Sequence, residues 1–206
     1  SLLIEARAPK RTLILGPTYS EYSRELSFSG SSQEYYHLKE EYDFQLDVED
    51  LCHTLEAGGY DFLILCNPNN PTSSAILQED MRQLLRFCKD SDIFVMIDET
   101  YVEFAPDIHA VTAVPLTREF ENLMVLRGVS KFFAAPGMRL GYGITGNQEF
   151  LWKMKEKQIP WSLNSIGAFA GELMLKDTAY IDRTRSLILS ERDHLYQALS
   201  ADPDYK

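Results

Sequence analysis

The stretch Asp61-Phe-Leu-Ile-Leu-Cys-Asn-Pro-Asn-Asn-Pro-Thr-Ser73 decides the fold class. Its first half is continuously apolar rather than alternating, which is typical of a strand covered on both faces in a parallel sheet. Its second half, from Asn67, has the asparagine and proline content of a turn-rich loop. A buried strand that runs directly into a polar loop indicates a ligand site, because open α/β sheets bind ligands at the carboxyl ends of their strands.

The same pattern recurs on both sides of this stretch. Further strands are predicted at Arg11–Leu15, Gln33–Lys39, Ile93–Ile97, Asn122–Leu126 and Met138–Thr145, the last of them antiparallel because its connection is short. Helices are predicted at Tyr19–Ser27 with Thr18 as cap, from Asp47 to Gly58, and at Gln78–Asp90, Gln148–Lys157, Ser165–Lys176 and Tyr180–Ser200; Ala105–Thr117 is expected to be irregular. We therefore expect one doubly wound, mostly parallel α/β sheet flanked by helices over residues 1–206.

Composition excludes several classes of function. The 206 residues carry a net charge of −11, which argues against nucleic acid as a partner. No apolar run approaches the roughly 20 residues of a membrane span. Four scattered histidines and an odd count of three cysteines give no metal-like spacing, so no metal site is expected. The cysteines fit free thiols in a reducing cytoplasm; they are Cys52, Cys66 and Cys88.

Three polar clusters follow predicted strands, namely Asn67–Thr72, Asp98–Tyr101 and Gly128–Arg139. Parallel strands bring all three to one crevice. Lys131 lies just past an apolar strand, and we expect burial there to disfavour its charged form and make the amine nucleophilic. Pyridoxal phosphate (PLP) needs such an amine for a Schiff base, a carboxylate for its ring nitrogen, donors for its 3′ oxygen, a phosphate clamp and a stacking aromatic.

The segments N-P-N-N-P-T, I-D-E-T-Y-V-E-F and R-G-V-S-K-F-F-A-A-P-G-M-R-L-G-Y resemble the PLP-dependent fold-type I enzymes of aminotransferase class I/II. The likeness is strongest to the branch of histidinol-phosphate aminotransferases and threonine-phosphate decarboxylases. The resemblance implies a role for each matching residue: Lys131 as Schiff-base lysine and proton shuttle, Asp98 on the pyridine nitrogen, Asn70 and Tyr101 on the 3′ oxygen, Tyr19 stacked on the ring, and Ser130 and Arg139 beside the phosphate.

Two positions depart from the family pattern. Ser73 stands where the family has glycine, which costs little if the backbone there avoids positive φ. Gly128 stands where the family usually has a serine or threonine hydroxyl on the phosphate, so PLP binding should be weaker. These departures leave open a non-catalytic domain on the same fold; a plain nucleotide-binding domain is disfavoured because no G-x-G-x-x-G or P-loop occurs.

The resemblance also implies what the whole protein does. It would be an aminotransferase acting on an amino acid or a phosphorylated amine, or alternatively a threonine-phosphate decarboxylase, and a homodimer at full length. The chain would be the large PLP-binding domain truncated at both ends, with 178–206 a helix leading to an absent small domain. We expect the fragment alone to be inactive.

Overall fold

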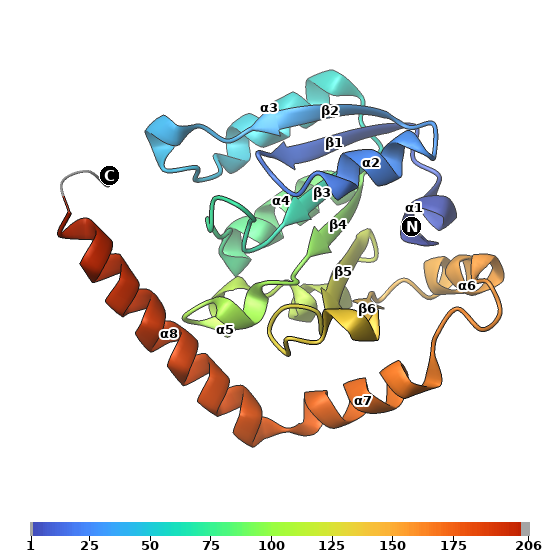
Figure 1. Ribbon diagram of the computed structural model, residues 1–206. Helices are drawn as coiled ribbons and strands as arrows, with labels where there is room; N and C mark the ends of the chain where they lie inside the picture. Colours follow the sequence, from blue (N-terminus) through green and yellow to red (C-terminus); the bar gives the residue numbers. More distant parts are fainter. Residues whose placement is uncertain (1, 203–206) are drawn as a thin grey trace.

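The structure, a computed structural model, describes residues 2–202 and contains one six-stranded sheet (Figure 1). The strand order is β2-β1-β3-β4-β5-β6. All neighbouring pairs are parallel except β5 and β6, which are antiparallel. The predicted mostly parallel sheet and its antiparallel last strand are thus confirmed. The strands are β1 (Arg11–Gly16), β2 (Ser32–His37), β3 (Phe62–Cys66), β4 (Phe94–Asp98), β5 (Leu123–Gly128) and β6 (Gly141–Ile144).

Helices cover both faces of the sheet. On one face α3 (Val48–Gly58) and α4 (Gln78–Asp90) pack against the strands. On the other face lie α1 (Leu2–Arg7), α2 (Glu21–Ser27) and α6 (Gln148–Lys157). The doubly wound arrangement expected from the sequence is therefore the arrangement found.

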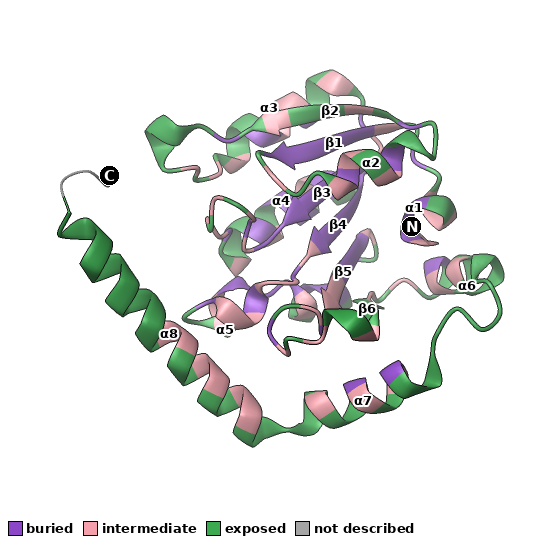
Figure 2. Ribbon diagram, in the orientation of Figure 1, coloured by how far each residue is buried: buried purple, intermediate pink, exposed green. Residues whose placement is uncertain are grey.

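Successive residues of β3 enter two different hydrophobic cores. Leu63 and Leu65 pack with α3 and α4, whereas Phe62, Ile64 and Cys66 pack on the α1, α2 and α6 side. All five side chains are buried, as Figure 2 shows for the central strands. Full burial of one such side chain contributes about 1.5–3 kcal/mol. Burial on both faces is the physical reason for the continuously apolar stretch.

Of the two predicted helix caps, Asp47 is confirmed and Thr18 is not. Asp47 begins α3 by accepting a hydrogen bond from the Asp50 backbone N–H at 3.1 Å, and Gly59 ends it with φ +64°. The prediction of Thr18 as the cap of α2 is wrong. Ser20 precedes this helix without a side-chain cap, while Thr18 donates a hydrogen bond to Asn69 at 2.9 Å. Thr18 instead joins two loops at the end of the sheet.

The carboxyl ends of the central strands lie level with one another. Cys66 is in register with Asp98, and Asp98 with Leu126. The chain runs from β1 to β2 on one side and then returns past β1 to β3 on the other, so the strand order reverses between β1 and β3. Loops diverge at such a reversal and leave a crevice in which ligands of open α/β sheets bind.

The predicted irregular stretch Ala105–Thr117 has more structure than expected. It contains α5 (Ile108–Val111) and a 3-10 helix, η3 (Val114–Arg118). The ordering comes from Glu99, whose buried carboxylate accepts hydrogen bonds from Thr112 and from the Ala113 backbone N–H. The other 3-10 turns are η1 (Glu40–Tyr42), η2 (Val102–Phe104) and η4 (Pro136–Met138).

The last two helices, α7 (Ser165–Lys176) and α8 (Thr178–Ser200), run around the edge of the sheet rather than over it (Figure 1). None of the 23 residues of α8 is buried. Its first turns are held by Tyr180, which donates to the Phe132 carbonyl at 3.1 Å, and by Arg185, which donates to the carbonyls of Glu103 and Ala105. The far half of α8 extends into solvent (Figure 2).

Two kinds of feature are absent from the described residues. Between residues 2 and 202 no helix combines the length and apolar character needed to span a membrane. Within the same part of the chain, no cluster of at least three His, Cys, Asp or Glu side chains is arranged to hold a metal ion.

Candidate active site

Asp98 ends β4 and is held by donors on both carboxylate oxygens. Oδ1 accepts hydrogen bonds from the backbone N–H of Thr100 at 2.9 Å and from the Thr100 hydroxyl. Oδ2 accepts a hydrogen bond from the Tyr22 hydroxyl at 2.8 Å. The side chain is half-buried. Hydrogen bonds to both oxygens fix the orientation of the carboxylate.

Tyr22 places α2 next to Asp98, a contact that was not predicted from the sequence. Burial and the charge of Asp98 raise the pKa of its phenol, so the hydroxyl remains a proton donor at physiological pH. Its ring meets the Tyr19 ring edge-on, with centroids 5.7 Å apart and an interplanar angle of 86°. Tyr19, the predicted stacking aromatic, is half exposed on the loop before α2.

Cys66 is the third titratable side chain of this group. It ends β3 beside Asp98, and its thiol donates to the Pro68 carbonyl at 3.3 Å. Burial and the charge of Asp98 raise the pKa of the Cys66 thiol to about 11. The thiol is therefore neutral and unreactive at physiological pH, as expected for a buried cysteine.

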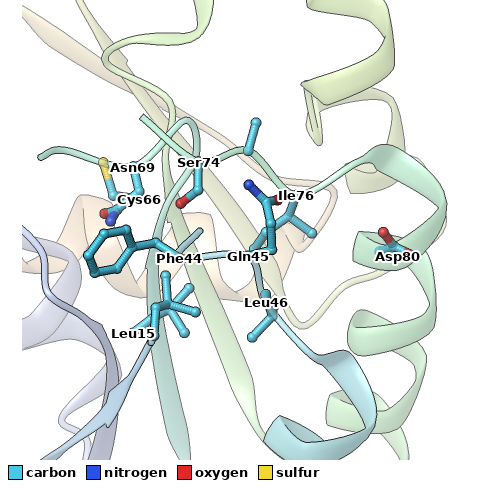
Figure 3. A pocket seen from close by; sticks show the side chains of 11 residues that line it. Leu15, Phe44, Gln45, Leu46, Cys66, Asn69, Ser74, Ile76 and Asp80 are labelled. Carbon is cyan, nitrogen blue, oxygen red and sulfur yellow. The ribbon is translucent and has the colours of Figure 1, made fainter. Parts of the chain in front are cut away.

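Asn69 joins the loops that follow β1 and β3 across the reversal of strand order. Its side-chain amide donates to the Pro17 carbonyl and to the Thr72 hydroxyl, both at 2.8 Å, and its oxygen accepts from Thr18. Asn69 also lines a cavity of about 40 Å³ together with Phe44, Leu15 and Ser74 (Figure 3). Cofactor sites occupy roughly 300 Å³ or more, so a ligand would have to lie outside this cavity, over the strand ends.

Lys131 lies three residues past the end of β5 in a loop. Its Nζ is 5.7 Å from the centroid of the Tyr101 ring, so the structure brings these two predicted residues together. The expectation that Lys131 is buried is wrong, because the side chain is exposed. The apolar residues that suggested burial point elsewhere: Phe132 is buried, and the Phe133 ring stacks on Tyr180 with centroids 5.8 Å apart.

The other predicted residues lie at the same edge of the sheet but make fewer contacts. Asn70 is half-buried next to Asn69, and Ser130 is half-buried next to Lys131. Arg139 is exposed in a left-handed conformation (φ +49°) and donates to the Pro136 carbonyl at 3.1 Å. Among the described residues, Arg139 is thus placed in its own loop rather than against the rest of the predicted set.

A buried ion pair lies directly behind the site. The Glu99 carboxylate has no exposed surface and accepts hydrogen bonds from Arg127 Nε at 3.0 Å and Nη2 at 2.7 Å. Burial works against the charge on Arg127, but Glu99 and Glu103 outweigh it and raise the pKa of the guanidinium. Burial raises the pKa of Glu103 above its usual value. This pair ties the end of β5 to the segment after β4.

Comparison with known proteins relates almost the whole chain to one family. The model of the family described as aminotransferase class I and II matches residues 2–206. The chain belongs to this family. It is a family of PLP-dependent enzymes, so the predicted relationship is confirmed.

Individual relatives of this aminotransferase-family chain carry two kinds of name. It is 34% identical over 198 residues to the threonine-phosphate decarboxylase of Salmonella typhimurium, covering 95% of this chain and 52% of that protein. It is 36% identical over 190 residues to the histidinol-phosphate aminotransferase of Clostridium kluyveri, covering 92% and 51%. The chain thus spans about half the length of the curated relatives it matches.

A solved structure supports the same fold. The histidinol-phosphate aminotransferase from Clostridium acetobutylicum superposes with a TM-score of 0.89 at 32% identity. The match covers 97% of this chain and 58% of that one. The sheet and helices of the family are therefore those described above.

Ser73, which replaces the family glycine, has a backbone conformation that glycine adopts more easily. Its φ is +54°, so the backbone does not avoid positive φ, and a serine has a steric cost here that a glycine would not have. The conformation is fixed by a tight loop in which Ser73 N–H donates to the Asn69 carbonyl at 2.9 Å and Asn69 N–H to the Ser74 carbonyl at 2.9 Å.

We expect Ser73→Gly to stabilise the protein, because glycine adopts positive φ without the steric cost of a side chain. The gain should be about 1 kcal/mol in the free energy of unfolding, measured by urea denaturation. Ser29→Gly is a suitable control, since Ser29 is not among the residues of positive φ. An unchanged or lower stability of Ser73→Gly would contradict this account of the loop.

Sequence reasoning missed three residues that build the site: Tyr22, Asn69 and Thr100. Each acts on a predicted residue or on the loop that carries one. A signal existed for Thr100, because a threonine two residues after an aspartate commonly donates to its carboxylate in a turn. Tyr22 had none, because its partner is 76 positions away in sequence.

Proposed function

We propose that the protein is a PLP-dependent aminotransferase of an amino acid or a phosphorylated amine, and that this chain holds the cofactor. The observation that carries the proposal is Asp98, a carboxylate fixed at both oxygens at the end of a buried strand. A carboxylate in this setting suits the protonated ring nitrogen of PLP. Lys131 and Tyr101 lie together at the same end of the sheet.

The residues present fit the cofactor by their chemistry. Asp98 would pair with the ring nitrogen, and Asn70 and Tyr101 would donate to the 3′ oxygen. Tyr19 offers a half-exposed ring for stacking. The phosphate would lie near Ser130 and Arg139, whose exposed guanidinium is suited to a charge-assisted contact.

Bound PLP supplies an electron sink that stabilises negative charge at the substrate α-carbon. Lys131 would take the proton from that carbon at Nζ and deliver it in the transfer of the amino group. Asp98, held in place by the donors from Tyr22 and Thr100, would pair with the ring nitrogen and keep it protonated. The fixed position of Asp98 at the end of β4 limits the reorganisation needed during reaction.

Threonine-phosphate decarboxylation is the second candidate, favoured by the Salmonella relative. In that reaction Lys131 would return a proton to the α-carbon after CO₂ leaves. The bond that breaks depends on how the substrate is held. Two assays of the full-length protein separate these reactions. Turnover of histidinol phosphate that requires 2-oxoglutarate supports transamination. Release of CO₂ from threonine phosphate without an acceptor supports decarboxylation. Failure of both reactions would refute the proposal.

Assembly as a homodimer and residence in a reducing compartment are part of this proposal. Large apolar side chains are exposed along and before α7, including Trp161 at 97% and Ile166 at 74%. Such a surface supports burial against another chain. The three cysteines are unpaired, which supports a reducing cytoplasm. Sedimentation analysis of the full-length protein would test the dimer.

Gly128→Ser is expected to tighten PLP binding. The change restores a hydroxyl at the position where the family carries one, and a hydrogen bond to a charged group contributes about 1.5 kcal/mol. The dissociation constant, measured by fluorescence titration, should fall about tenfold.

Gly128→Ala is the matched control for this change. A Cβ at residue 128 would lie 3.2 Å from the Leu140 carbonyl oxygen, and alanine adds this crowding without the hydroxyl. β6 is a four-residue edge strand and has room to shift. Equal dissociation constants for the serine and alanine variants would contradict a hydroxyl contact with the phosphate.

A further inference from the structure

The carboxylate of Asp98 has one acceptor position left. A carboxylate offers about four lone-pair positions on its two oxygens. Thr100 fills the positions of Oδ1 with its backbone N–H and its hydroxyl, and Tyr22 fills one position of Oδ2. Among residues 2–202 no other donor reaches Oδ2. The remaining position is therefore on the oxygen that Tyr22 holds.

We propose that Tyr22 is a positioning residue for Asp98: its hydroxyl occupies one lone pair of Oδ2 and directs the other towards the crevice, where the cofactor ring nitrogen would bind. This inference rests on the proposed function. Tyr22 does not touch the reacting atoms and acts through Asp98.

Tyr22 is well suited to hold a fixed direction. It is buried near the start of α2, in the core that also contains Ile14, Leu26 and Met96. The edge-on contact with Tyr19 restrains its ring from the crevice side. Asp98 cannot rotate away either, because Thr100 binds its other oxygen twice. The hydroxyl and the carboxylate are thus each fixed by a different element of the fold.

One other titratable group, the Cys66 thiol, lies against this pair. Cys66 packs against it from β3, and burial raises the pKa of its thiol to about 11, so the thiol is neutral below that pH. Burial and the Asp98 charge raise the pKa of the Tyr22 phenol. Across the neutral range the Tyr22 hydroxyl is therefore protonated and donates to Asp98.

Loss of the Tyr22 hydroxyl has a defined electrostatic consequence. Oδ2 would keep more of its negative charge, and the proton shared with the ring nitrogen would shift towards the carboxylate. The ring would then carry less positive charge. The nitrogen that joins Lys131 to the cofactor would become more basic, since a nearby positive charge disfavours its protonation.

The test is Tyr22→Phe in the full-length protein loaded with PLP. The visible absorbance of the bound cofactor is titrated with pH, and the midpoint is expected to rise by about one pH unit, equivalent to one charge-assisted hydrogen bond. The kcat should fall about tenfold. The KM for the amino acid should change by less than about twofold, because Tyr22 contacts Asp98 rather than substrate.

Tyr36→Phe is the matched control. Tyr36 donates to Asp50 at 2.6 Å, so it is also a tyrosine–aspartate pair, but it joins the edge strand β2 to α3 on the opposite face of the sheet. The midpoint of the absorbance titration of Tyr36→Phe should equal that of wild type. If wild type binds PLP at Lys131 and Tyr22→Phe titrates like wild type, the role of Tyr22 is refuted and the proposed function stands. If wild type gives no borohydride-reducible band, both are refuted.

Discussion

Replacing Lys131 by alanine is expected to abolish the covalent attachment of PLP and to lower kcat by on the order of 10⁴-fold. In the proposed function this amine is both the attachment point and the group that moves the substrate proton, and a positioned acid–base group contributes up to about this factor. Borohydride treatment of the full-length protein, followed by peptide mass analysis, should place the label on Lys131 and leave the alanine variant unlabelled.

Lys155→Ala is the control for the Lys131 variant. Lys155 Nζ lies 4.9 Å from the Trp152 ring centroid, so this lysine also lies over an aromatic ring, but on α6 and away from the strand ends. Its activity and labelling should equal those of wild type. A reduced adduct that persists in Lys131→Ala would refute the assignment of Lys131 and, with it, the proposed site.

Arg127→Ala is expected to destabilise the protein by about 3–5 kcal/mol. The change leaves the fully buried Glu99 carboxylate without its cationic partner, and an unpaired buried charge costs this much. Glu103 lies 4.0 Å from the same guanidinium, so two carboxylates lose its charge. The free energy of unfolding from urea denaturation measures the loss.

Arg24→Ala provides the comparison for Arg127. Arg24 binds Glu21 at 2.9 Å, but the two side chains are 65% and 39% exposed. Exposed pairs contribute at most about 1 kcal/mol, so this variant should be nearly as stable as wild type. The double variant Glu99→Gln with Arg127→Met should recover part of the stability, because it removes both charges. Equal losses for Arg127→Ala and Arg24→Ala would contradict the importance of burial.

The features that could be predicted from the sequence are those set by neighbouring residues. The strand Phe62–Cys66 is apolar at every position, a pattern that is typical of a strand covered on both faces. Asp47 caps a helix four residues before Leu51 because a cap depends on a single turn of backbone. Asp98 was placed at the crevice because parallel strands end together.

The features that could not be predicted depend on contacts between distant segments. Lys131 is exposed because it lies in a loop past the strand, and the length of β5 relative to β4 is not evident from an apolar run. The conformation of Ser73 follows from the Asn69 turn rather than from serine itself. The Tyr22–Asp98 contact joins α2 to β4, a pairing that requires the folded sheet.

The projecting helix α8 is attached at one end to the loop that carries Lys131. Tyr180 and Arg185 fasten its first turns to the segments around Phe132 and Ala105. From Arg185 to Ser200 the helix extends about 22 Å at a rise of 1.5 Å per residue. A tilt of about 10° at the attachment therefore moves the far end by about 4 Å. Because Tyr180 is bonded to the Phe132 carbonyl, such a tilt would also displace the backbone next to Lys131.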